Sequence, residues 1–219
     1  MIRLAHKYEM EELLSQALLA LKKYFPETFE GWRNRVPLRA RLFSIEVIHI
    51  AHLTMTPTLL PAAFYVCART TDRVLDGWVR EDGSVIRLST VDFKQLIRGL
   101  PRLGERTARL LDSVFKARRS KFHCATADAC HSALRAYYTD DVAKNFIDAH
   151  KIQRGRTNLC NLLLKKGLCE QCAEGFNSEY LTMYCSLWDA LPAIFECQQS
   201  VRCSHYMHAT TSHGITVHH

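Results

Sequence analysis

The sequence predicts a mainly α fold, an irregular helical bundle with one small β-hairpin at about residues 77–88. Apolar residues recur at intervals of three and four along most of the chain, which is the pattern of amphipathic helices. The clearest change of period surrounds Asp82-Gly83, a dipeptide that strongly favours a tight hairpin turn. With 219 residues, of which 47% are hydrophobic and 23% charged, the chain is long enough to bury a core.

Three helices are predicted before the hairpin. In the first, apolar residues from Met10 to Phe25 alternate with polar ones at helical spacing, and Pro26 ends it. The second covers about residues 43–52. The third begins near Pro57, a residue tolerated in the first turn of a helix, and extends to about residue 70. The hairpin is marginal alone, so we expect it to lie on these helices.

Three more helices are predicted after the hairpin, at about residues 90–115, 125–150 and 173–191. Ser89 or Thr90 caps the first of them, and Pro101 and Gly104 are expected to break or kink it. Residues 151–166 are basic and amide-rich, which is typical of a linking loop or a weak helix.

The formal net charge of +7 raises the hypothesis of a nucleic-acid-binding protein. The basic residues are scattered, however, and the densest cluster lies at a predicted helix end, where cations favour the helix dipole and the solvent. That cluster consists of Lys116, Arg118, Arg119 and Lys121. Aromatic and basic residues do not alternate as they do in stacking platforms, so this hypothesis ranks last.

The chain predicts an intracellular protein, cytoplasmic or nuclear, with no membrane segment. Its longest apolar stretches are well short of the ~20 residues that cross a bilayer. The N-terminus is charged throughout, unlike a secretory signal. Nine cysteines are an odd number, which argues against a complete disulfide framework. The polar, His-rich residues 196–219 predict a disordered tail.

Common enzyme signatures are missing from the sequence. It contains no glycine-rich phosphate loop, no G-x-S-x-G elbow and no H-E-x-x-H motif. The sequence therefore gives no sign of an enzyme that uses one of these motifs. His49 and His52 lie three residues apart on a predicted helix, but with no third ligand nearby we expect them to be packing residues.

The candidate site consists of four cysteines, Cys124, Cys130, Cys169 and Cys172. Zinc prefers four such ligands in a tetrahedron, often supplied as two pairs. Cys169-x-x-Cys172 has the usual spacing of one pair, after Gly167 and before a helix, whereas the other pair is wider. The two pairs are also further apart than the usual ~12–20 residues of small zinc modules. Cys160, His123 and His131 are substitute ligands.

Two alternatives to a structural zinc site stay open. Cys169 and Cys172 could form the redox couple of a thiol oxidoreductase, although such a pair is expected after a strand in a βαβ unit, and no such pattern surrounds it. The four cysteines could also be reduced thiols that pack together. Cys67, in an apolar helix, is predicted to be a small core residue.

The order of several segments resembles the C-terminal region of the BTB/POZ-domain proteins of mushroom-forming fungi. RLAHKYEMEELLSQALLALKKYFP is similar to the closing helices of a BTB domain. IEVIHIAHLTMTPTLLPAAFYVCAR, DGSVIRLSTVDFKQLIRG, CATADAC, LCEQC and WDALPAIF then follow in the same order as in that family.

The resemblance covers about residues 2–195. It implies closing helices of a BTB-like domain over residues 1–26 and a BTB-associated helical region over residues 27–195. It also implies a protein-interaction module without enzymatic activity, whose partner it does not identify. A link to cullin-type ubiquitin ligases follows only by analogy, because the strand-rich body of a BTB domain does not precede Arg3 in this sequence. If the chain is a shortened form of such a protein, part of the apolar stripe of the first helix lacks its cover, and self-association through that patch is expected.

Overall fold

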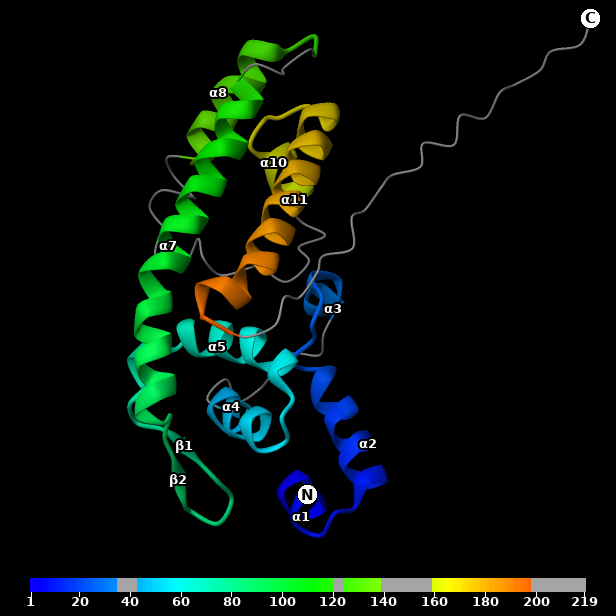
Figure 1. Ribbon diagram of the computed structural model, residues 1–219. Coiled ribbons are helices and arrows are strands. Elements are labelled where there is room, and N and C mark those ends of the chain that lie inside the picture. The colour runs from blue at the N-terminus through cyan, green and yellow to red at the C-terminus, as the bar shows by residue number, and fades with distance from the viewer. Residues whose placement is uncertain (35–42, 120–123, 139–158, 198–219) are drawn as a thin grey trace, which may run out of the picture.

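The structure is a computed structural model that describes residues 1–34, 43–119, 124–138 and 159–197. The predicted fold class is confirmed, because helices make up most of this part of the chain and its one sheet is a two-stranded hairpin (Figure 1). Residues 198–219 of the predicted tail (196–219), about half of the helix predicted at 125–150 and half of the linking segment predicted at 151–166 lie outside the described residues. The side chains of the basic cluster at 116–121 do so too.

In chain order, the elements are α1 (Ile2–Lys7), α2 (Glu11–Lys22), α3 (Phe29–Asn34), α4 (Phe43–Leu53), the 3-10 turn η1 (Pro57–Leu59), α5 (Leu60–Ala68), α6 (Thr71–Val74), β1 (Trp78–Val79), β2 (Val85–Ile86), α7 (Thr90–Arg119), α8 (Ala127–Tyr137), α10 (Leu159–Lys165) and α11 (Glu170–Ile194). The strands pair antiparallel with Trp78 opposite Ile86. Gly83 adopts a left-handed conformation in the turn, as the Asp-Gly signal predicted.

Pro101 and Gly104 were expected to break or kink a helix, which is α7. The break is wrong, because α7 continues from Thr90 to Arg119. Its buried positions Leu96, Leu103 and Leu111 keep one helical register across the proline. α7 packs along α11, and this contact outweighs the local cost of the proline. Ser89 caps α7, because its hydroxyl oxygen accepts a hydrogen bond from the amide of Asp92 at 3.1 Å.

Aromatic side chains form the core where α3, α5 and the last turns of α11 meet. The indoles of Trp32 and Trp188 lie 4.8 Å apart between ring centroids, and Tyr65 meets Trp32 edge to face at 5.3 Å. All three are at most 1% exposed. The Trp188 indole N–H donates to the Glu27 carbonyl at 2.9 Å. Every residue of α5 is buried, so this helix is the centre of the packing.

Helices α8 and α10, together with the last turns of α7 and the first turns of α11, form the end of the molecule away from α1 and α2, which is called the upper region (Figure 1). There the buried ring of Phe176 on α11 contacts Phe115 of α7 and Tyr137 of α8. α7 and α11 are long enough to reach both ends, whereas α8 and α10 have their principal described contacts within the upper region. The opposite end, with α1 to α5, is the lower region.

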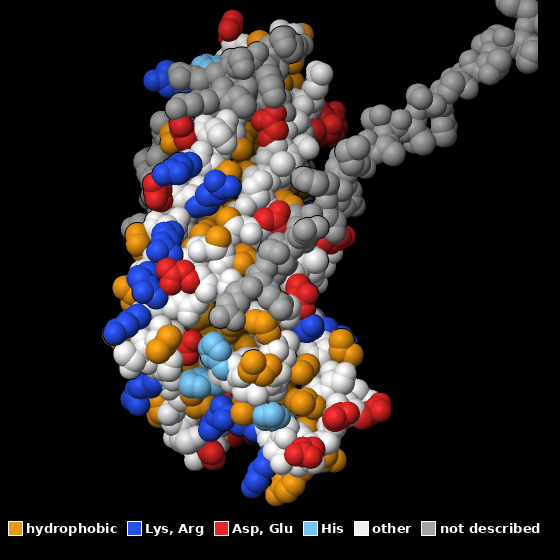
Figure 2. Space-filling view, viewed as in Figure 1, with side chains coloured by type: hydrophobic (Ala, Val, Ile, Leu, Met, Phe, Trp, Pro, Cys, Tyr) orange, Lys and Arg blue, Asp and Glu red, His pale blue; other side chains and the backbone are white. Residues whose placement is uncertain are grey.

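The positive charge of the chain is spread over its surface. Figure 2 shows Lys and Arg side chains along the outer edge formed by α7, with acidic side chains between them. Several of these cations are paired, since Arg98 and Arg102 both bind the carboxylate of Glu196, at 2.9 and 2.7 Å.

Candidate metal centre

Four cysteine sulfurs converge where the first turns of α8 and α11 meet. Cys124 precedes α8, Cys130 lies in its first turns, Cys169 is the N-cap of α11 and Cys172 lies in its first turn. The four Sγ atoms all lie within 4.8 Å of one another. Residues 39 positions apart, Cys130 and Cys169, thus contribute to one cluster, as the sequence analysis required.

The spacing of the sulfurs fits a tetrahedral metal. A Zn–S bond of about 2.3 Å corresponds to sulfurs about 3.8 Å apart along each edge of a tetrahedron. The Sγ atoms of Cys124 and Cys130 are 3.8 Å apart. Since no pair exceeds 4.8 Å, a shortening of about 1 Å or less along any edge completes the geometry. All four residues are free cysteines. The residues are therefore close enough to hold one metal ion.

A glycine-dependent turn places the second pair. Gly167 has φ of +99°, and its amide donates to the carbonyl of Leu164, while the Leu168 amide donates to Leu163. These two bonds form a Schellman motif, which ends α10 and reverses the chain. The side chain of Leu168 is buried against the core, so Cys169 enters α11 in a fixed position.

Hydrogen bonds to sulfur surround the cluster. The backbone N–H of Cys169 donates to the sulfur of Cys130 at 3.3 Å, which links the two segments directly. The hydroxyl of Thr126 lies 3.5 Å from the sulfur of Cys130 and 3.8 Å from that of Cys124. Hydrogen-bonding groups beside metal ligands are typical of metal sites, because they stabilise charge on the ligand and fix its orientation. The N-termini of α8 and α11 add two positive dipole ends.

Two of the thiols have opposite shifts in acidity. Desolvation opposes ionisation of Cys124, but hydrogen bonds from the Cys172 thiol and from Thr126 outweigh it and lower the pKa of Cys124 to about 7. Burial raises the pKa of Cys172, and its hydrogen bonds with Cys124 and Cys169 raise it further. Negative charge is therefore favoured at the more exposed sulfur. Four thiolates this close together require a cation to offset their repulsion.

None of the substitute ligands that the structure describes belongs to this cluster. Cys160 and His131 are not members of the converging group, and His123 is outside the described residues. The Nε2 atom of His49 donates to the Arg87 carbonyl at 2.8 Å, and that of His52 lies 2.9 Å from Asp92 Oδ1. These two histidines thus connect α4 to the chain at the start of α7, in agreement with a packing role.

Cys67 also has the predicted place in the core. Its side chain is fully buried, and burial raises the pKa of its thiol to about 12 despite a hydrogen bond with Ser44 at 3.1 Å. It therefore stays a neutral thiol. The Cys169-x-x-Cys172 pair follows helix α10 rather than a strand, so the βαβ setting of thioredoxin-like sites does not occur at this position.

The sequence analysis identified the four sulfurs and missed Thr126. A threonine two residues after Cys124, at the start of a predicted helix, is a signal that could have indicated a polar group beside the sulfurs. Within the residues that the structure describes, no helix combines the length and apolar character needed to cross a membrane. A comparison of the chain with protein-family models, curated proteins and solved structures finds no match.

Proposed function

We propose that the chain is a non-catalytic protein-interaction module in which Cys124, Cys130, Cys169 and Cys172 bind one structural zinc ion. The convergence of these four sulfurs from two distant segments is the observation that supports the proposal. Zinc is favoured because four thiolates in a tetrahedral arrangement suit its borderline-soft character.

The donor set favours a structural role for the metal over a catalytic one. Catalytic zinc keeps one coordination position for water or substrate, whereas four cysteines close the coordination sphere. The ion would join the starts of α8 and α11, and through Cys169 it would also fix the end of α10. Its role would be to order the upper end of the molecule.

The wider assignment rests on the sequence resemblance to the C-terminal part of fungal BTB-domain proteins. On this proposal the chain acts inside the cell by binding another protein. An association with cullin-type ligases rests on analogy alone.

Metal analysis of the purified protein tests the zinc centre. We expect about one zinc per chain, and we expect Cys169→Ser to lose it. Cys160→Ser is the matched control, because Cys160 is a partly buried free cysteine on α10 outside the cluster, and this variant should keep its zinc. An unmutated protein that contains no zinc, and takes up none after reduction, would refute the centre.

A thiol oxidoreductase that uses Cys169 and Cys172 is the second candidate. One observation favours it: this pair occupies the start of a 25-residue helix, whose dipole stabilises a thiolate. It predicts rapid alkylation of Cys169 at neutral pH and turnover of a disulfide substrate by the reduced, metal-free protein. Slow alkylation without turnover would exclude it.

A further inference from the structure

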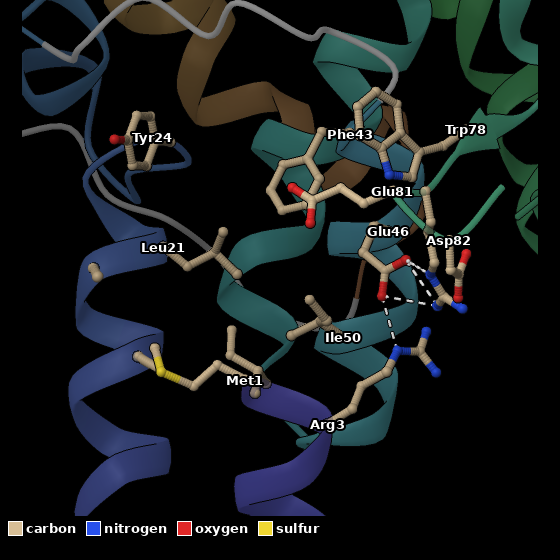
Figure 3. A pocket seen from close by; sticks show the side chains of 14 residues that line it. Met1, Arg3, Leu21, Tyr24, Phe43, Glu46, Ile50, Trp78, Glu81 and Asp82 are labelled. Carbon is tan, nitrogen blue, oxygen red and sulfur yellow. Dashed lines mark hydrogen bonds and ion pairs between the residues drawn. The ribbon is translucent and has the colours of Figure 1, made fainter. Parts of the chain in front are cut away.

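An open groove separates the helical pair α1–α2 from α4 and the hairpin. Its volume is about 730 Å³. Leu21 of α2 and Tyr24, in the turn after α2, face Phe43 and Ile50 of α4 across it, and Met1 closes the lower side (Figure 3). α2 packs mainly on α1, which explains why this side of α2 is left open.

The apolar lining follows a helical repeat. Ala17, Ala20 and Leu21 lie on one face of α2 at spacings of three and four residues, and Tyr24 follows in the turn after the helix. Ala17 and Leu21 are buried and form the floor on this side, whereas Ala20 and Tyr24 are exposed. The alanines make this wall shallow. On the other side, Phe43 and Trp78 meet edge to face with centroids 5.9 Å apart. Ala20 and Tyr24 thus provide an exposed apolar wall over a buried floor, on which apolar side chains at positions i, i+3, i+4 and i+7 of a second helix can pack.

The carboxylates that line the groove differ in burial and in pairing with arginine. Both oxygens of the buried Glu46 carboxylate are engaged, by the guanidinium groups of Arg3 at 2.8 Å and Arg80 at 3.0 Å. Glu81 and Asp82, in contrast, are exposed on the hairpin turn at the rim (Figure 3). Hydrogen bonds from the side chain and backbone of Ser84 and the nearby charge of Arg80 lower the pKa of Asp82, so both carboxylates of this rim are anionic at neutral pH. Oδ1 of Asp82 accepts both of the Ser84 hydrogen bonds.

We infer that this groove binds an amphipathic helix of a partner protein, with its apolar face on α2 and a lysine or arginine against Glu81 and Asp82. The inference rests on the proposed role as an interaction module and names the chemistry of the partner. It runs against the net charge of +7, which by itself would attract an acidic partner. The acidic rim therefore predicts a basic partner, whereas the net charge of the chain predicts an acidic one.

Two helical peptides of about 18 residues provide the probes, each with leucine at i, i+3, i+4 and i+7. One has lysine and the other glutamate at the remaining positions. Fluorescence anisotropy of each labelled peptide is measured with the full chain at physiological ionic strength, where long-range charge effects are screened. We expect the lysine peptide to bind at least about tenfold more tightly than the glutamate peptide. Equal binding, a preference for glutamate or no binding overturns the inference.

Paired variants locate the binding. Ala20→Phe fills the groove and should weaken the lysine peptide at least about tenfold, whereas Leu19→Phe, at an exposed position that does not line the groove, should not. Glu81→Lys should weaken it similarly. Glu12→Lys changes the net charge equally at an exposed position outside the groove and should have little effect. Equal effects within either pair contradict the inference.

A second copy of the chain is the competing occupant. Sedimentation of the unmutated protein and of Ala20→Phe decides this: self-association that Ala20→Phe abolishes would replace the partner helix with a second copy and overturn the inference. Zinc content is measured on the same samples. If the unmutated protein contains zinc but does not bind the lysine peptide, the groove is refuted and the metal centre is not. If it binds the peptide but contains no zinc, the metal centre is refuted and the groove is not.

Discussion

The two ends of α11 are stabilised in different ways. Its last turns lie in an aromatic core, where Trp188 contacts Trp32 and Tyr65 and is itself only 1% exposed. Its first turn lies in a cluster of sulfurs, where Cys169 and Cys172 meet two cysteines from the start of α8. One helix therefore connects a region built by apolar burial with a region that we propose depends on a metal.

The two regions differ in whether apolar burial alone can stabilise them. The lower region includes α5, in which all nine residues are buried, so its packing supplies its own stability. In the upper region, α8 and α10 are short helices, of 11 and 7 residues, that cannot persist alone in water. The upper region should therefore respond to the metal and the lower region to changes in the core.

Metal removal should have the largest effect. A structural zinc contributes on the order of 10 kcal/mol of apparent binding free energy, so chelation or Cys172→Ser should open the upper region. We expect amide exchange in α8, α10 and the first turns of α11 to accelerate by about 100-fold or more, with α4 and α5 little changed. Uniform acceleration through the chain would show that the two regions are not separable.

Trp188→Ala should disrupt the lower region. It removes a buried indole that packs on two aromatic rings and binds the Glu27 carbonyl, and it should cost about 3–5 kcal/mol. At about 2–4 °C per kcal/mol, the Tm should fall by roughly 10 °C in calorimetry. Trp188→Phe, which keeps most of the volume, should cost less. We expect the zinc content of both variants to match that of the unmutated protein, and zinc loss would contradict the comparison.

Two glycines of α7 should give opposite results when replaced by alanine. A Cβ at Gly99 would overlap the ring of Phe195, so Gly99→Ala should destabilise the lower region by about 1–3 kcal/mol. Nothing lies within 4 Å of a Cβ at Gly104, so Gly104→Ala should stabilise the helix by about 0.5–1 kcal/mol. Urea titration of both variants measures the signs. A stabilising Gly99→Ala would mean that Phe195 does not pack against Gly99.

Loss of the α7 cap should have the smallest effect. Ser89 accepts a hydrogen bond from the Asp92 amide and donates one to the Asp92 carboxylate at 2.6 Å. Ser89→Ala should therefore cost about 1 kcal/mol, and Ser89→Asn, which can still cap, should cost less. Urea midpoints test this difference. Equal losses in both variants would assign the effect to something other than capping.

Features set by local chemistry could be predicted from the sequence. Asp82-Gly83 predicted the hairpin, because its turn requires a left-handed residue, and Ser89 predicted the cap. Pro101 misled the analysis, since its local cost is offset by contacts between α7 and α11 that no local pattern records. The short helices α1, α3 and α6 were not predicted, because pieces of four to six residues give little periodicity.

The candidate site was predictable in its membership but not in its geometry. Spacing singled out four cysteines, yet only the turn at Gly167 and the packing of Leu168 show how Cys169 reaches Cys130. The groove could not be predicted at all. Its walls come from α2, α4 and the hairpin, and it exists because α2 packs on α1 and stands apart from α4.

X-ray absorption at the zinc edge of the purified protein tests the central claim most directly, because it reports the atoms bound to the metal. We predict a single shell of four sulfur ligands at about 2.3 Å. A shell that contains nitrogen or oxygen, or zinc bound in less than a stoichiometric amount after reconstitution, would contradict the four-cysteine centre.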